Sequence, residues 1–118
     1  MATLRIEGSE LQIELSTLEK LGALSRGVRV PLSSVSSVRV SQKPWRELRG
    51  LRVGTAVPFV VLLGRMYYRG GADFVAMYGN RPTAIVELRD GAPFKRLFVT
   101  DAAPSVVDQL RAAAGRAS

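Results

Sequence analysis

Residues 83–100 read TAIVELRDGAPFKRLFVT and carry the clearest fold signal in the chain. Two apolar-rich runs flank the Asp-Gly-Ala-Pro segment at 90–93, whose residue types favour a turn, so we predict a β-hairpin. The following segment has Val, Leu and Ala at helical spacing over 103–114, with Asp101 as a candidate N-cap and Pro104 in the first turn. The chain is therefore predicted to end in an amphipathic helix that covers an apolar surface.

Alternation of apolar and polar residues extends this pattern toward the N-terminus. On both sides of Gly8-Ser9 it predicts a hairpin over residues 3–15. Ser16 and Glu19 have capping-box spacing, which predicts a short helix with Leu18, Leu21 and Leu24 as its apolar stripe. Further strands are predicted at 28–31, 35–41, 51–55, 64–68 and 73–78, with a basic loop around Trp45 at 43–50.

A run of strands with one closing helix indicates a mainly β fold. We expect a β-rich α+β domain, an antiparallel barrel or sandwich of about seven strands. The C-terminal helix caps it, and the short helix follows the first hairpin. The 118 residues contain no linker or repeat, which predicts a single domain spanning residues 1–118.

The composition argues against several kinds of site. The chain has no Cys and no His, which removes disulfides, thiolate ligands and the commonest general base. We therefore expect no enzyme activity, no metal and no cofactor. The longest apolar run, at 56–63, is too short to span a bilayer, and the N-terminus lacks a secretory pattern. The expected location is the cytoplasm.

Positive charge is concentrated in the middle of the chain. The formal net charge is +7, and residues 26–69 hold nine basic residues against one acid, Glu47. A compositional bias toward Arg explains this excess without a function, and an anionic partner is the alternative. Trp45 could stack on a base, but no nucleic-acid motif is present and we do not expect that partner. The candidate contacts with an anion or membrane surface are Arg39, Lys43, Arg46, Arg49 and Arg52.

The apolar run at 57–63 supports the leading functional hypothesis. Because it does not alternate, we predict a strand covered on both faces, the second face by another chain. This favours self-association or a protein partner. In the alternative, Phe59 is exposed and enters an anionic membrane interface, which makes the protein peripheral to a membrane. The candidate interface residues are Trp45, Pro58, Phe59, Val61 and Leu63.

Three segments resemble bacterial pleckstrin-homology-like (PH-like) domains. They are VPLSSV at 30–35, LRGLRVGTAVP at 48–58 and GRMYY at 64–68. The resemblance implies a binding or scaffolding module. Family members that bind inositol phosphates use a basic loop in the first hairpin, whereas residues 7–10 here are Glu-Gly-Ser-Glu, so no specific phosphoinositide is expected. The helix after that hairpin, and Phe59 where the family often has Gly, depart from the pattern.

Overall fold

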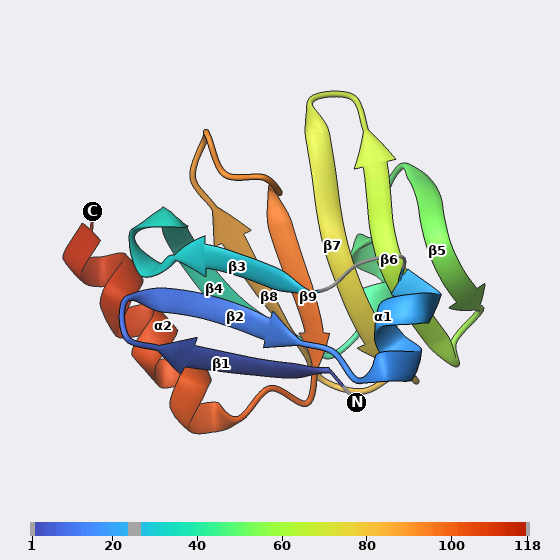
Figure 1. The fold of residues 1–118 in the computed structure, drawn as a ribbon, viewed down its shortest axis with the longest axis horizontal. Helices are drawn as coiled ribbons and strands as arrows, with labels where there is room; N and C mark the ends of the chain where they lie inside the picture. The colour runs from blue at the N-terminus through green and yellow to red at the C-terminus, as the bar shows by residue number, and fades with distance from the viewer. Residues whose placement is uncertain (1, 24–26, 118) are drawn as a thin grey trace.

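The computed structural model describes residues 2–23 and 27–117. In this part of the chain nine strands form two sheets, with two α-helices and two short 3-10 helices (Figure 1). The elements are β1 (Thr3–Glu7), β2 (Glu10–Glu14), α1 (Thr17–Ala23), β3 (Val28–Pro31), η1 (Leu32–Ser34), β4 (Val35–Ser41), η2 (Pro44–Glu47), β5 (Leu51–Val57), β6 (Val61–Tyr68), β7 (Gly71–Tyr78), β8 (Thr83–Leu88), β9 (Arg96–Thr100) and α2 (Pro104–Ala117).

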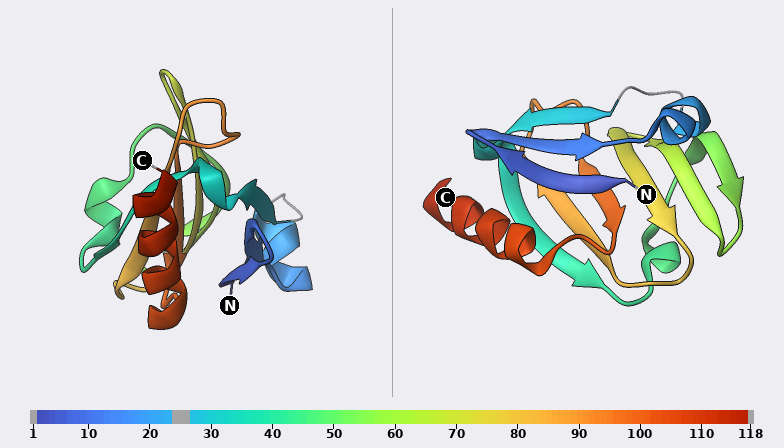
Figure 2. Two further views of the ribbon diagram at one scale, coloured as in Figure 1. Left: turned by 90° about the vertical axis from the view of Figure 1, so that its left-hand side faces the viewer. Right: turned by 60° about the horizontal axis from the view of Figure 1, so that its bottom comes forward.

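The two sheets stack as an open sandwich (Figures 1 and 2). The small sheet has the order β1-β2-β3, and the large sheet has the order β4-β8-β9-β7-β6-β5. Strands β7 and β8 follow each other in the chain, but β9 lies between them in the sheet. Strand β9 is antiparallel to β8 and parallel to β7. The predicted mainly β sandwich with a C-terminal helix is confirmed, with nine strands rather than about seven.

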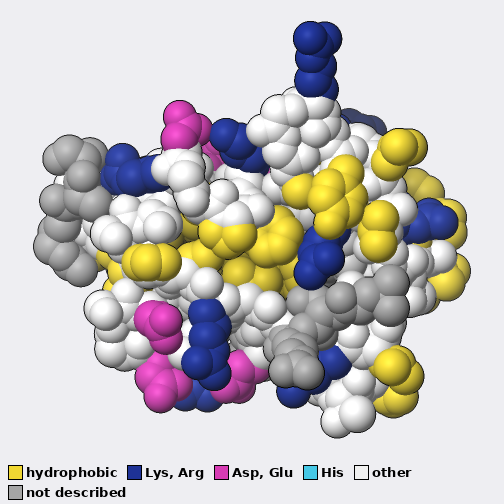
Figure 3. Space-filling model, turned by 45° about the horizontal axis from the view of Figure 1, so that its top comes forward, with side chains coloured by type: hydrophobic (Ala, Val, Ile, Leu, Met, Phe, Trp, Pro, Cys, Tyr) yellow, Lys and Arg dark blue, Asp and Glu magenta, His cyan; other side chains and the backbone are white. Residues whose placement is uncertain are grey.

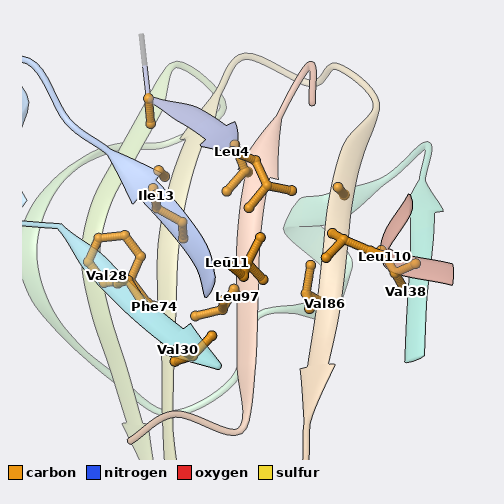
Figure 4. Close-up of a cluster of buried hydrophobic side chains, with 14 of the residues drawn as sticks. Leu4, Leu11, Ile13, Val28, Val30, Val38, Phe74, Val86, Leu97 and Leu110 are labelled. Atoms are coloured by element: carbon orange, nitrogen blue, oxygen red, sulfur yellow. The ribbon is translucent and has the colours of Figure 1, made fainter. Parts of the chain in front are cut away.

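The main core lies between the sheets, on what we call the front face of the large sheet. Leu11 and Val30 of the small sheet meet Phe74 and Leu97 of the large sheet, and all four are buried (Figure 4). Leu110 of α2 joins this cluster. Burial of such side chains stabilises the fold by about 1.5–3 kcal/mol each, so this layer accounts for much of the hydrophobic stabilisation.

Helix α2 closes the open side of the sandwich next to β4 (Figure 2). Its predicted apolar stripe is confirmed, because Val107, Leu110, Ala113 and Ala114 are buried. The predicted cap is wrong. The helix begins at Pro104, and the Asp101 carboxylate instead forms an ion pair with Arg81 at 2.6 Å.

Helix α1 begins at the predicted capping box. The Ser16 amide donates to Glu19 Oε1 at 2.9 Å, and the Glu19 amide donates to Ser16 Oγ at 3.2 Å. The predicted apolar stripe is wrong, since Leu18 and Leu21 are exposed and Leu24 lies outside the described residues. The helix turns Glu19 and Ala23 inward instead, and the carbonyl of Gly22 accepts a hydrogen bond from the Thr55 hydroxyl.

The back face of the large sheet carries a second core. Leu62, Met66, Met77 and Phe98 are among its buried members. Trp45, Leu48 and Ala56 pack against it, so the segment 43–50 around η2 forms a cover over this face. The chain's own segment thus covers the back face at Leu62, and a cover from another chain over the rest of the run at 57–63 stays a prediction.

Candidate functional site

The apolar run at 57–63 is a turn followed by the start of β6. Phe59 and Val60 are 65% and 58% exposed, and Val57 is exposed as well. Leu62 and Leu63 are buried, but on opposite faces of the sheet. The prediction of one strand covered on both faces is wrong, because the chain reverses at Pro58 and leaves four apolar residues at the edge of the sheet.

The turn places Phe59 in a conformation that glycine normally occupies. The Val60 amide donates to the Val57 carbonyl at 2.9 Å, and Pro58 holds the second position of the turn. Phe59 holds the third position with φ = 62°. This residue order is that of a type II turn, whose third position requires positive φ and favours Gly or Asn. For other residues the left-handed conformation costs about 1–2 kcal/mol.

Phe59 lies against Trp45 of η2. The ring centroids are 5.4 Å apart and the planes meet at 47°. Trp45 Nε1 donates to the Gly79 carbonyl at 2.9 Å, which ties η2 to the end of β7. Lys43, Trp45, Arg46, Phe59 and Asn80 line a shallow hollow at this place. We call Lys43, Trp45, Arg46, Val57, Phe59 and Val60 the tip surface.

The five candidate anion contacts fall into two groups. Among the residues that the structure describes, no carboxylate lies within ion-pair distance of Lys43, Arg46 or Arg52, and all three are exposed. Of these, Lys43 and Arg46 belong to the tip surface, whereas Arg52 lies toward the far end of β5. Hence the tip surface holds two cations without an acidic neighbour.

The other two candidates have partners within the protein. Arg39 pairs with Glu47 and lies 4.0 Å from Glu87. Hydrogen bonds from Arg39 lower the pKa of Glu47. This carboxylate is therefore ionised, and both of its oxygens accept hydrogen bonds from Arg39. Arg49 lies over the Tyr68 ring, 4.1 Å from its centroid, and donates to the Tyr68 hydroxyl at 3.0 Å. Arg39 and Arg49 therefore have a structural role.

A buried polar network holds the η2 cover in place. Arg96 Nη2 lies 2.6 Å from Asp73 Oδ2 and also donates to the Glu47 carbonyl at 2.9 Å. The Tyr68 hydroxyl donates to Asp73 Oδ1 at 2.7 Å. We did not predict these residues as part of the site. The available signal was a charged residue in each of two apolar strands, Asp73 in β7 and Arg96 in β9, since buried charges are normally paired.

The candidate protein-interface residues are also divided. Pro58 and Phe59 are exposed, and Trp45 is partly exposed beside them. Val61 packs against the main core and Leu63 is buried in it. Trp45, Pro58 and Phe59 are thus available to a partner, whereas Leu63 is not.

Strand β5 presents a second exposed apolar surface. It is an edge strand of the large sheet, so one side of its backbone has no neighbouring strand in the described chain. Leu51 is 79% exposed and Val53 40% exposed, and Tyr67 on β6 is exposed next to them. Figure 3 shows hydrophobic side chains together with Lys and Arg over the β5, β6 and α1 half, whereas the Asp and Glu visible there lie over the other half.

The opposite edge of the same sheet differs. Strand β4 carries polar Ser36, Ser37 and Arg39 and an irregularity in its pairing with β8 between Val35 and Ser37. Helix α2 also packs along it. Charges, bulges and a covering helix are the usual protections of an edge strand against pairing with another chain. Strand β5 has one charged residue, Arg52, and contacts helix α1 through the Thr55–Gly22 hydrogen bond, but no strand of the described chain pairs with its outer side.

The remaining observations concern metal sites, membrane spans and relatives. Within residues 2–23 and 27–117 no group of three acidic side chains is placed to hold a metal ion. No helix in the described chain has both the length and the apolar character needed to cross a bilayer. Comparison with protein-family models, curated proteins and solved structures found no match. The resemblance to PH-like domains therefore stays a prediction.

Proposed function

We propose that this protein is a non-catalytic interaction module that self-associates through strand β5. The observation that carries the proposal is the contrast between the two edges of the large sheet, of which β4 is protected and β5 is open and apolar. An open strand edge offers unpaired N–H and C=O groups to another strand. The absence of both His and Cys supports a binding role rather than a catalytic one.

The sequence of β5 is compatible with pairing to a second copy of itself. Antiparallel pairing centred on Gly54 would place Leu51 of one copy opposite Val57 of the other. Arg52 would then lie opposite Ala56 rather than opposite another Arg. Like charges directly opposite each other destabilise a strand pair, and this register avoids them. Apolar cross-strand pairs each contribute about 0.2–1 kcal/mol, in addition to the backbone hydrogen bonds.

The test compares the mass of the protein in solution with that of two matched variants. Val53→Lys places a charge on β5, and Val40→Lys places the same charge on β4. The two positions are matched in exposure, because Val53 is 40% exposed and Val40 is 41% exposed. Light scattering and sedimentation over a concentration series should show a dimer for the wild type and for Val40→Lys, and a shift to monomer for Val53→Lys. A wild-type protein that remains monomeric throughout would refute self-association.

A further inference from the structure

We propose that the tip surface docks on an anionic lipid bilayer, with Phe59 and Val60 entering the interface while Lys43 and Arg46 contact the headgroups. This surface adjoins the β5 edge and shares Val57 with it, but its other residues lie outside β5. It lies at the turn that joins β5 to β6, next to the end of β7, where the Gly79 amide donates to the Val60 carbonyl at 2.8 Å (Figure 1). Docking therefore does not require that β5 pairs with another chain.

The first observation is an unfavourable residue at the most exposed place. Phe59 holds a left-handed conformation with φ = 62°, yet its side chain is 65% exposed and buries little area in return. Its contact with Trp45 recovers only part of that cost. Backbone strain that contributes nothing evident to folding points to a function at that position. Phe59 lies between the exposed Val57 and Val60, so transfer of this turn from water to an apolar environment is favourable.

The second observation is charge complementarity. Lys43 and Arg46 line the same hollow as Phe59, and no carboxylate of the described chain lies within ion-pair distance of either one. The nearest acid in the sequence, Glu47, is held by Arg39. A cation beside an anionic membrane contributes about 1 kcal/mol to binding. Apolar residues with flanking cations are the combination that interfacial docking requires.

The third observation favours a bilayer over nucleic acid. Stacking on a base requires an open aromatic face, but Trp45 is packed between the back core and Phe59, and its indole N–H is already bound to Gly79. The exposed valines, Val57 and Val60, offer nothing to a phosphate backbone. A bilayer interface accepts aliphatic side chains without a shaped partner. The fixed Trp45 supports Phe59 from behind, so the turn can enter the interface without rearranging.

The experiment uses the full chain and its one tryptophan. Trp45 touches Phe59, so its emission reports directly on the tip surface. Vesicles of phosphatidylcholine, with and without phosphatidylglycerol, are mixed with the protein, and binding is followed by co-sedimentation and by the shift of the Trp45 emission. We expect binding and a blue shift with phosphatidylglycerol only. Raising the salt concentration should weaken binding, since screening acts on the two cations.

Two variants and a matched control locate the contact. Phe59→Asn removes the ring and places a residue that tolerates positive φ at the turn. Arg46→Glu reverses one charge of the tip surface, and Arg29→Glu makes the same reversal at an exposed position of β3 in the other sheet. We expect Phe59→Asn and Arg46→Glu each to lower vesicle affinity at least about fivefold. Arg29→Glu should change it less than about twofold.

Three results would overturn the proposal. The first is equal binding to vesicles with and without phosphatidylglycerol, or to neither. The second is a loss with Arg29→Glu as large as that with Arg46→Glu, which would indicate attraction by net charge alone. The third is binding to duplex DNA at the same ionic strength with no binding to the anionic vesicles. Circular dichroism of each variant confirms that the fold is retained.

Discussion

Asp73 and Arg96 form a buried ion pair across the only parallel strand pair in the described chain. They face each other in the β7–β9 register, with Arg96 Nη2 2.6 Å from Asp73 Oδ2 and Asp73 completely buried. Arg96 also donates to the Glu47 carbonyl, so the pair connects the sheet to the segment that covers its back face. The position of Trp45, and through it the tip surface, depends on two charges in apolar strands, Asp73 within β7 and Arg96 at the start of β9.

Removal of one partner should therefore be costly. Asp73→Ala leaves the Arg96 guanidinium buried without its carboxylate, which costs about 3–5 kcal/mol of unfolding free energy. Urea unfolding measures the loss. Because the network anchors η2, we also expect the native Trp45 emission to move to longer wavelength. Asp90→Ala, at an exposed ion pair with Lys95, is the control and should change neither. An equal effect of the two variants would contradict the role given to Asp73.

The capping carboxylate of α1 predicts a dependence on pH. Burial alone would raise the pKa of Glu19, but hydrogen bonds from the Ser16 amide and from the Tyr78 hydroxyl outweigh it and lower that pKa below 4.5. A lowered pKa in the folded state stabilises the protein above the unfolded value, and this contribution is lost as the pH falls through the folded value. Glu19→Gln should thus cost about 1–2 kcal/mol near neutral pH.

The gap between the wild type and Glu19→Gln should narrow as the pH falls through the lowered folded-state pKa of Glu19, because the wild-type carboxyl then becomes protonated as well. Urea unfolding at a series of pH values tests this. A gap that persists in acid would show that the effect comes from packing rather than from charge. The Tyr78 hydroxyl, whose pKa is raised by burial and by Glu19, stays a donor throughout this range.

The strain at Phe59 predicts an unusual response to mutation. Phe59→Asn relieves a conformational cost of about 1–2 kcal/mol and loses a ring contact with Trp45 worth about 0.5–1.5 kcal/mol. Removal of this large aromatic side chain should therefore change the unfolding free energy by less than about 1 kcal/mol. Phe98→Ala in the back core is the comparison, at about 3–5 kcal/mol. A large loss with Phe59→Asn would mean that Phe59 supports the fold.

Two glycines on adjacent strands allow β5 and β6 to pair closely. Gly54 and Gly64 face each other in the register, both at positive φ. A Cβ added to Gly64 would lie 2.1 Å from the Val53 carbonyl oxygen, which is too close for any real contact. Gly64→Ala should cost more than about 2 kcal/mol in thermal or urea unfolding. Gly91 also has a positive φ, but a Cβ there would meet open space. Gly91→Ala therefore measures the cost of backbone strain without a clash, and it should cost less than Gly64→Ala.

Local signals allowed most of the elements to be predicted. The hairpin over residues 3–15, the capping box at Ser16 and the terminal helix all depend on contacts close in sequence, and the structure contains each of them. Predictions that needed a distant partner were less accurate. The apolar run at 57–63 has the composition of a buried strand, and only the pairing of β5 with β6 shows that its first half is a turn.

The same distinction holds for the candidate site. Composition indicated cations and aromatic residues in the middle of the chain. It did not show that Arg39 forms an ion pair with Glu47, or that Arg49 donates a hydrogen bond to Tyr68. Nor did it show that Lys43 and Arg46 lie beside Phe59. These facts depend on a network that joins β7, β9 and η2, whose members are more than twenty residues apart.

By itself, the sequence determined the β-rich class, the order of the elements and the excess of positive charge, because alternation, turn chemistry and composition act locally. The tertiary structure decided which apolar residues are buried and which cations remain free. The reason is that the η2 segment of the same chain packs over the back face of the large sheet. With that face covered, most of the large apolar side chains left exposed in the described chain lie on β5, in the β5–β6 turn and on the outer side of α1, and Val40 of β4 and Tyr67 of β6 are the others.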